Sequence, residues 1–214
     1  VAETLDRAAK KLDTDLATQP AQRAKLQDTL GYTYHSLGLY REAVLLFEKV
    51  REYDLAISGP KHPRTLAAMN NLALSYADAG RKEEALKMQE EVLALRRKVL
   101  GPKHLDTLSA VNNLANSYFD ASRKDEALKL QEEVLRLRRN MLGPEHPDTL
   151  GAMNNLALSF FDAGRKEEVL KLQEEVLPLY RKLRGPEHPD TLSAMNNLAK
   201  SYADAGRKDE ALKL

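Results

Sequence analysis

Residues 59–100 read GPKHPRTLAAMNNLALSYADAGRKEEALKMQEEVLALRRKVL, and residues 143–184 match this stretch at 31 of 42 positions. Two motifs inside it, Gly-Pro-x-His and Asn-Asn-Leu-Ala, recur every 42 residues. The first motif begins at Gly59, Gly101, Gly143 and Gly185. A repeat of this length is typical of proteins that stack one supersecondary unit many times. The repeat therefore decides the architecture.

Each copy predicts two helices. In residues 59–100, apolar residues first recur with the spacing of an amphipathic helix, and a second such stripe follows after Gly80. Pro63 suits the first position of a helix, where its missing N–H costs nothing. Gly80 suits the left-handed residue that ends a helix. We expect helices at about 62–79 and 82–99, antiparallel because the connection is short.

Stacking such hairpins buries the apolar face that one hairpin leaves open, so the chain predicts a single all-α solenoid. Residues 1–16 are predicted to form an N-terminal capping helix that packs through Val1, Leu5, Ala8 and Leu12. The following segments are a divergent first repeat, three full repeats and an incomplete fifth: residues 17–58, 59–100, 101–142, 143–184 and 185–214.

The divergent copy carries a recognisable pattern, composed of Leu30, Gly31, Tyr34, Gly38, Tyr40, Ala43 and Phe47. This pattern resembles the tetratricopeptide repeat, and the later copies are similar to its 42-residue form in kinesin light chains. Residues 1–40 resemble the junction that follows serine/threonine kinase domains in bacterial signalling proteins. The resemblance implies a right-handed superhelix of hairpins that binds peptides or partner helices in its concave groove.

The composition excludes several other classes. With 33 Lys+Arg against 32 Asp+Glu, the chain lacks the excess of positive charge that a nucleic-acid surface requires. The absence of Cys excludes disulfides and thiolate zinc sites. No apolar run approaches the ~18 residues of a membrane span, and the N-terminus lacks the apolar region of a signal peptide. We therefore expect a cytoplasmic protein that binds neither nucleic acid nor membrane.

No catalytic motif is present, so we expect neither an enzyme nor a cofactor. Four histidines recur with the repeat and suggest a metal site: His62, His104, His146 and His188. Packed helix axes lie about 8–10 Å apart, whereas a metal ion holds its ligand atoms within roughly 2 Å. We expect these histidines to make contacts at helix starts or between repeats, with no metal.

The resemblance places the first Asn of each pair on the concave side: Asn70, Asn112, Asn154 and Asn196. Amides both donate and accept, so a row of them can pair with the backbone of an extended peptide. A hydrogen-bonded ladder between adjacent helices is an equally open interpretation. For the second Asn of each pair the ladder is favoured, with Gln89, Gln131 and Gln173 as further members.

One turn further along the same helix, the groove positions differ between copies and are candidates for partner specificity: Tyr32, Leu74, Asn116, Leu158 and Lys200. The next position holds His35 in the first copy, and Phe119 and Phe161 in the third and fourth. Isolated aromatic side chains in a groove make good hot spots. Ordinary packing between helices is an equally open role for the two phenylalanines.

Several residues depart from the repeat formula or form charged rows. Ser122 replaces the turn glycine, Leu105 replaces a proline, and Pro178 is expected to kink its helix. An acidic row precedes an arginine by three residues in each copy: Asp78, Asp120, Asp162 and Asp204. Local pairing is the favoured interpretation, and a groove edge that prefers basic ligands is the alternative.

These features predict a non-catalytic scaffold that holds a protein or peptide ligand in the groove. Two alternatives stay open. The first is self-assembly into a homo-oligomer through the apolar end at Leu214, within a second helix. The other is regulation of a kinase or switch domain in the same polypeptide.

Overall fold

The computed structural model describes residues 2–214, so the predicted packing of Val1 lies outside the described residues. All regular elements of this range are helices, joined by short turns. The helices fall into two compact units, and the second unit begins at Ser122. Each unit is described by itself.

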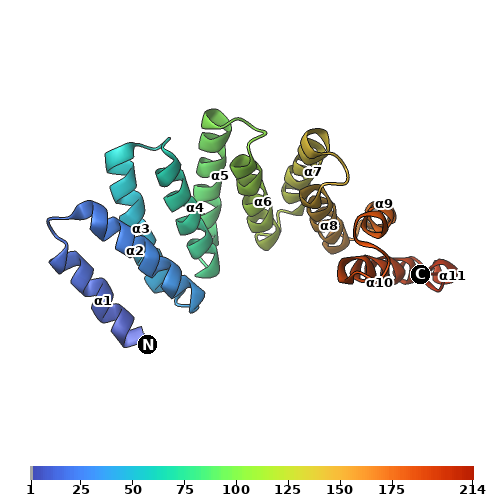
Figure 1. The fold of residues 1–214 in the computed structure, drawn as a ribbon, viewed down its shortest axis with the longest axis horizontal. Coiled ribbons are helices and arrows are strands. Elements are labelled where there is room, and N and C mark those ends of the chain that lie inside the picture. The colour runs from blue at the N-terminus through green and yellow to red at the C-terminus, as the bar shows by residue number, and fades with distance from the viewer. Residues whose placement is uncertain (1) are drawn as a thin grey trace. The chain divides into compact units, whose positions relative to one another are not determined.

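The first unit contains a lone helix followed by two helix hairpins and the first helix of a third (Figure 1). The helices are α1 (Ala2–Asp15), α2 (Pro20–Ser36), α3 (Tyr40–Ser58), α4 (Pro63–Asp78), α5 (Lys82–Val99) and α6 (Leu105–Asp120). From α2 to α6 each helix packs on the next one in the chain, as expected for a stack of antiparallel hairpins.

The second unit repeats the same arrangement of paired helices. Its helices are α7 (Lys124–Leu142), α8 (Pro147–Asp162), α9 (Lys166–Arg184), α10 (Pro189–Asp204) and α11 (Lys208–Ala211). Here too each helix packs on its successor. The predicted helices at 62–79 and 82–99 agree with α4 and α5 to within one residue at each end.

Two local rules set the helix ends. The Nδ1 atom of His62 accepts a hydrogen bond from the backbone N–H of Arg64, at 3.2 Å, and thereby caps α4. The same cap starts the equivalent helices at His104, His146 and His188. Gly80 then follows α4 with a φ of +78°, in the left-handed region that glycine tolerates. The expectation of a helix-start role for the histidines is confirmed.

The residues that depart from the repeated sequence leave the helix boundaries in place, and the kink expected at Pro178 stays a prediction. α6 still begins at Leu105, although the proline is missing there, and α9 runs continuously through Pro178. Ser122 takes the turn glycine's backbone conformation, with a φ of 61°, and no other non-glycine residue among 2–214 has a positive φ. Non-glycine residues are strained in this region, because Cβ approaches the backbone.

The core shows why one copy has a mid-helix aromatic and the others do not. In the first copy Phe47 is buried against Gly31, where an added Cβ would lie 2.9 Å from the ring. The equivalent residues of the second copy are Gln89 and Ala73, both buried. A smaller side chain in α5 thus leaves room for the extra methyl group in α4, as close packing requires.

The lone helix α1 is attached less firmly than the others. Among its side chains described here none is fully buried, and Leu5 and Ala9 make its apolar contacts with the core. The prediction that Ala8 packs there was wrong, because Ala8 is exposed and the adjacent Ala9 faces the core. The hydroxyl of the buried Tyr34 donates to Asp6 across 2.7 Å and adds a polar attachment.

Candidate peptide-binding surface

Asparagines of neighbouring helices are hydrogen-bonded in the first unit. The Nδ2 atom of Asn113 in α6 donates to Oδ1 of Asn70 in α4, at 3.1 Å. Asn71 donates in the same way to the hydroxyl of Tyr32 in α2, at 2.5 Å. At Asn70 the ladder between helices is therefore present. Because this bond uses the Oδ1 atom of Asn70, the NH₂ group of the same side chain can still donate to a ligand.

The second unit replaces this ladder with a pocket of about 240 Å³ between α8, α9 and α10. Its lining is Asn154, Ala157, Leu158, Gln173, Val176, Ala194 and Asn197, and we call it the amide pocket. The Oε1 atom of Gln173 is buried there without a hydrogen-bond partner. Buried acceptors without a partner are rare in folded proteins.

The predicted role of the three glutamines in the ladder was wrong for their acceptor atoms. Oε1 of Gln89, Gln131 and Gln173 is buried without a partner in every case. Gln89 and Gln131 are buried, whereas Gln173 lines the amide pocket together with Asn154 and Asn197. Amide side chains fill the volume of the missing aromatic but leave one polar atom unsatisfied.

The side chain of Asn154 donates to Tyr180, whereas the equivalent Asn70 is hydrogen-bonded to an asparagine of a neighbouring helix. The Nδ2 atom of Asn154 donates to the Tyr180 hydroxyl at 2.8 Å, and both of these residues are half-buried. On the Tyr180 side lies a second pocket, of about 410 Å³, which we call the tyrosine pocket. Its lining is Glu145, Pro147, Leu150, Gly151, Tyr180, Leu183, Arg184 and Asp190. The Asn154–Tyr180 pair thus adjoins both pockets of this unit.

The positions that vary between copies are exposed. Tyr32 is 51% exposed, Leu74 37% and Leu158 62%, and Asn116 and Lys200 are exposed as well. Leu158 reaches the amide pocket and Tyr32 a pocket of about 150 Å³ in the first unit. Burial raises the pKa of the Tyr32 hydroxyl, and the nearby Asp28 raises it further.

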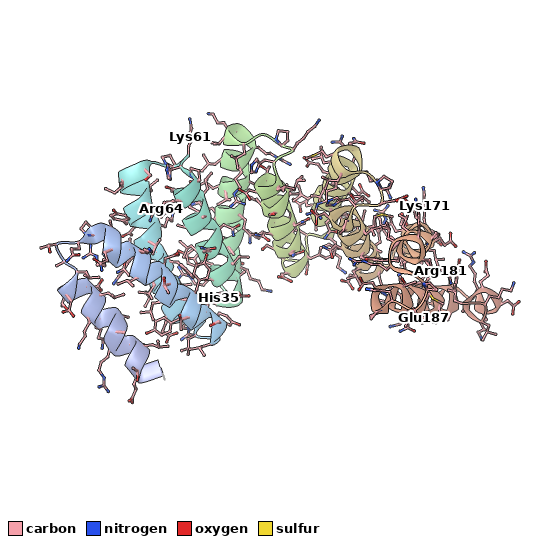
Figure 2. All side chains as sticks on the ribbon, viewed as in Figure 1. His35, Lys61, Arg64, Lys171, Arg181 and Glu187 are labelled. Atoms are coloured by element: carbon pink, nitrogen blue, oxygen red, sulfur yellow. The ribbon has the colours of Figure 1, made fainter. Side chains whose placement is uncertain are left out.

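The two predicted aromatic anchors differ. Phe161 is 49% exposed, with the ammonium group of Lys200 6.0 Å from its ring centre, whereas Phe119 is half-buried. His35, at the corresponding position of α2, is also half-buried and lies 2.8 Å from the Asp78 carboxylate. Figure 2 shows His35 near the end of α2 that lies away from Lys61. Phe161 is therefore the most accessible aromatic of this row.

The asparagines also differ in exposure. Asn70, Asn112 and Asn154 are half-buried, whereas Asn196 on α10 is exposed.

The predicted pairing of each aspartate with the arginine three residues later was wrong. Arg81, Arg123, Arg165 and Arg207 pair instead with the glutamates three residues further on: Glu84, Glu126, Glu168 and Glu210. Each arginine is the residue before a helix, so its side chain reaches that helix's first turn. Hydrogen bonding by the arginine lowers the pKa of Glu84.

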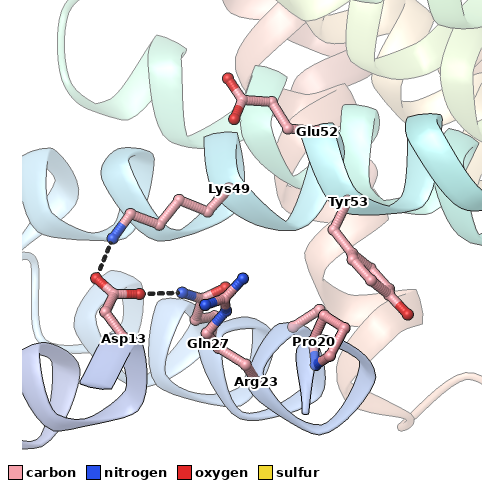
Figure 3. A pocket seen from close by; sticks show the side chains of 8 residues that line it. Asp13, Pro20, Arg23, Gln27, Lys49, Glu52 and Tyr53 are labelled. Atoms are coloured by element: carbon pink, nitrogen blue, oxygen red, sulfur yellow. Dashed lines mark hydrogen bonds and ion pairs between the residues drawn. The ribbon is translucent and has the colours of Figure 1, made fainter. Parts of the chain in front are cut away.

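A polar pocket of about 380 Å³ lies between α1, α2 and α3 (Figure 3). One oxygen of Asp13 accepts from Gln27 at 2.9 Å, and the other lies 2.6 Å from the ammonium nitrogen of Lys49. A single carboxylate of α1 thus joins both helices of the first hairpin. The contacts account for the attachment of α1, and they hold no group poised for chemistry.

Within the described chain, no three His, Asp or Glu side chains gather as a metal would require. The helices of residues 2–214 include none that is long and apolar enough to cross a membrane.

Family models of the tetratricopeptide repeat match residues 24–56, 65–106, 106–182 and 148–214. The chain belongs to the tetratricopeptide repeat family. The crystal structure of a Podosopora anserina kinesin light chain with nearly identical TPR-like repeats superposes on it with a TM-score of 0.81. The two share 31% identity, over 91% of this chain and 92% of that one.

Two more distant structures share the fold alone. BtubC from P. vanneervenii is 18% identical, with a TM-score of 0.76 over 99% of this chain and 85% of that one. MamA from Desulfovibrio magneticus RS-1 is 15% identical, with a TM-score of 0.62 over 89% of each chain. A comparison with curated protein sequences finds no match. The chain is thus an all-α tetratricopeptide solenoid of the kinesin light chain type, and the repeat boundaries assigned from the sequence stay predictions.

Sequence reasoning missed Gly151 and Tyr180, which shape the tyrosine pocket. A signal for them exists, because Tyr180 replaces an arginine of the second and third copies and Gly151 replaces alanine or serine.

Proposed function

We propose that this chain is a non-catalytic scaffold that binds an extended peptide on the face formed by the first helix of each hairpin. Tetratricopeptide repeats in general serve protein–protein interaction. The observation that carries the proposal is the amide pocket, in which Asn154, Asn197 and Gln173 surround a space of about 240 Å³. Three amides with an unsatisfied acceptor suit the alternating N–H and C=O groups of a peptide backbone.

The remaining groove residues support the same proposal. Leu158 and Phe161 expose apolar surface beside the amides, and Lys200 lies near the Phe161 ring. In the first unit Tyr32, Leu74 and Asn116 are exposed at the equivalent positions. Side chains that vary on an otherwise repeated surface provide selectivity, whereas the amides provide affinity for any backbone.

The test is a peptide-library selection followed by affinity measurement for the selected peptides. Asn154→Ala and Asn112→Ala are expected to weaken binding about tenfold each, because each removes one ligand hydrogen bond. Asn140→Ala is the matched control, since Asn140 is exposed near the end of α7 and lies outside both pockets. A large fall in melting temperature without a change in affinity would show that these asparagines are structural.

Phenylalanine substitutions test selectivity separately. Phe161→Ala and Phe119→Ala are expected to change which peptides the library yields, and the larger change is expected for the more exposed Phe161. Unchanged peptide selection by both variants would reject the assignment of this row to the groove.

A second candidate function is assembly with further copies of the chain. It is favoured by an exposed apolar side chain of α10, since Leu192 is 51% exposed. Light scattering over a dilution series tests it: a mass that falls from oligomer to 24.0 kDa on dilution supports assembly, whereas a constant 24.0 kDa excludes it.

A further inference from the structure

The fourth copy departs from the repeat formula at a small set of positions. Compared with both the second and the third copy, it differs at Glu145, Gly151, Phe160, Val169, Pro178, Tyr180, Leu183 and Arg184. Five of these eight residues line the tyrosine pocket: Glu145, Gly151, Tyr180, Leu183 and Arg184. Differences that converge on one cavity, although they come from separate segments of sequence, indicate a site peculiar to this copy.

The charges of the pocket change with these residues. The formula places Lys at the position of Glu145 and Arg at that of Tyr180, as in Lys61 and Arg96 of the second copy. Arg96 there donates to the backbone carbonyl of Asp106, at 2.6 Å. Tyr180, at the position of Arg96, instead accepts a hydrogen bond from the side chain of Asn154. The pocket therefore loses two cations and gains a carboxylate.

The pocket also gains one cation, Arg184, whose ion pair with Asp190 is long. Arg184 replaces a leucine of the formula, and its Nε atom lies 4.0 Å from the Asp190 carboxylate. The Nδ1 atom of His188 is near the same carboxylate but accepts a hydrogen bond from the backbone N–H of Asp190, so the second ion pair is that of Lys182 with Glu145. All these side chains are at least one-third exposed, so their ion pairs can exchange with a ligand at little cost.

Gly151 leaves space in the wall of the pocket. It lies inside α8, and glycine within a helix stabilises that helix less than alanine does. An added Cβ would meet no atom within 4 Å, so the packing of the helix does not require glycine. The equivalent residues Ala67 and Ser109 carry a side chain. The missing side chain therefore enlarges the pocket rather than relieving a clash.

From this lining we infer that the tyrosine pocket of the fourth copy binds an arginine side chain of the partner peptide. Leu150 and Leu183 suit the aliphatic stem of that side chain, and the Tyr180 ring suits a guanidinium group placed over its face. Glu145 and Asp190 supply the carboxylates for its charge. The inference rests on the proposed function, since the amide pocket on the other side of Asn154 holds the backbone of the same peptide.

A small ligand tests the pocket without any peptide. N-acetyl-L-arginine amide is titrated into the ¹⁵N-labelled chain, and the amide signals of Gly151 and Leu183 are followed by NMR. Saturable shifts are expected. N-acetyl-L-citrulline amide has nearly the same shape without the charge and is expected to bind about tenfold more weakly.

Variants locate the site. Glu145→Lys and Tyr180→Arg each restore the residue of the second and third copies and are expected to weaken the binding of arginine amide about tenfold. Glu187→Lys is the matched control, because Glu187, labelled in Figure 2, is the equivalent glutamate one repeat further on. Glu187 is exposed and does not line the pocket. The control is expected to bind like the unmodified chain. Denaturant unfolding of each variant confirms that it is folded.

The inference is overturned if arginine amide causes no saturable shift. Equal binding of the arginine and citrulline amides overturns it too, as does unchanged binding in both Glu145→Lys and Tyr180→Arg. The proposed function fails on a different result, the absence of any selected peptide that loses affinity in Asn154→Ala. The two failures can therefore be told apart.

Discussion

Asn154 donates its side-chain N–H to the Tyr180 hydroxyl across 2.8 Å, joining the first helix of a hairpin to the second. Asn154 lines the amide pocket and Tyr180 the tyrosine pocket, so this single hydrogen bond couples the two candidate sites of the second unit. In the first unit the equivalent asparagine, Asn70, accepts from Asn113 instead. The fourth copy thus exchanges a contact between repeats for one within its own hairpin.

The turn residue Ser122 predicts a stabilising substitution. Because its φ of 61° is unfavourable for a residue with a Cβ, Ser122→Gly is expected to raise the free energy of unfolding by about 0.5–1 kcal/mol. The reverse change, Gly164→Ser, is the matched control at the equivalent turn, where φ is +74°, and should lower it by a similar amount. Urea unfolding measures both, and two changes of the same sign would contradict this account.

A missing hydroxyl predicts a second stabilising change. Tyr76, Tyr118 and Tyr202 each donate to a glutamate of the preceding repeat, at 2.7–2.8 Å. The fourth copy has Phe160 at this position, and Glu132 is the equivalent glutamate. Phe160→Tyr is expected to add about 0.5–1 kcal/mol to the free energy of unfolding, which urea titration measures. Glu132→Gln in the same background should remove part of that gain, and a gain independent of Glu132 would refute the proposed bond.

The alkaline stability of the chain is linked to Tyr76. Burial, and then its hydrogen bond to Glu48, raise the pKa of Tyr76 to about 12 from an ordinary value of 10.0. The unfolded chain therefore releases this proton first, so stability present below pH 10 declines as the pH rises toward 12. Thermal unfolding across that range measures the decline. Tyr76→Phe should make it less steep, and an unchanged pH dependence would contradict the assignment.

Gly151 is predicted to lower the stability of the chain while it favours binding of arginine in the tyrosine pocket. Gly151→Ala is expected to raise the free energy of unfolding by about 0.5–1 kcal/mol, because alanine favours the helix and its methyl group meets no neighbour. The same methyl group reduces the tyrosine pocket, so arginine amide should bind less tightly. Calorimetric unfolding and the NMR titration test the two effects. Weaker binding together with lower stability would instead indicate damage to the fold.

The fold could be predicted from the sequence because its signals are local. Pro63 and Gly80 mark the ends of α4, and the 42-residue period extends that assignment to the other copies. The histidine caps follow from the same local geometry. Repetition also made the asparagine row visible, since the Asn pair returns in each of the four later copies.

The site could be predicted only where it follows the repeat. The partner of Asn154 depends on Tyr180, a departure 26 residues away whose importance appears only once α8 and α9 are packed. The partner of Arg81 is decided by its place before a helix, which favours Glu84 over Asp78. Both outcomes depend on the direction of a side chain, which periodicity does not fix.

The most direct test of the central claim compares peptide affinity between Asn154→Ala and the control Asn140→Ala, with peptides selected by the unmodified chain. The account predicts about tenfold weaker binding for Asn154→Ala and unchanged binding for the control, with both variants folded. Equal affinity of the two variants, or a library that yields no bound peptide, would contradict the claim that the amide pocket holds a peptide.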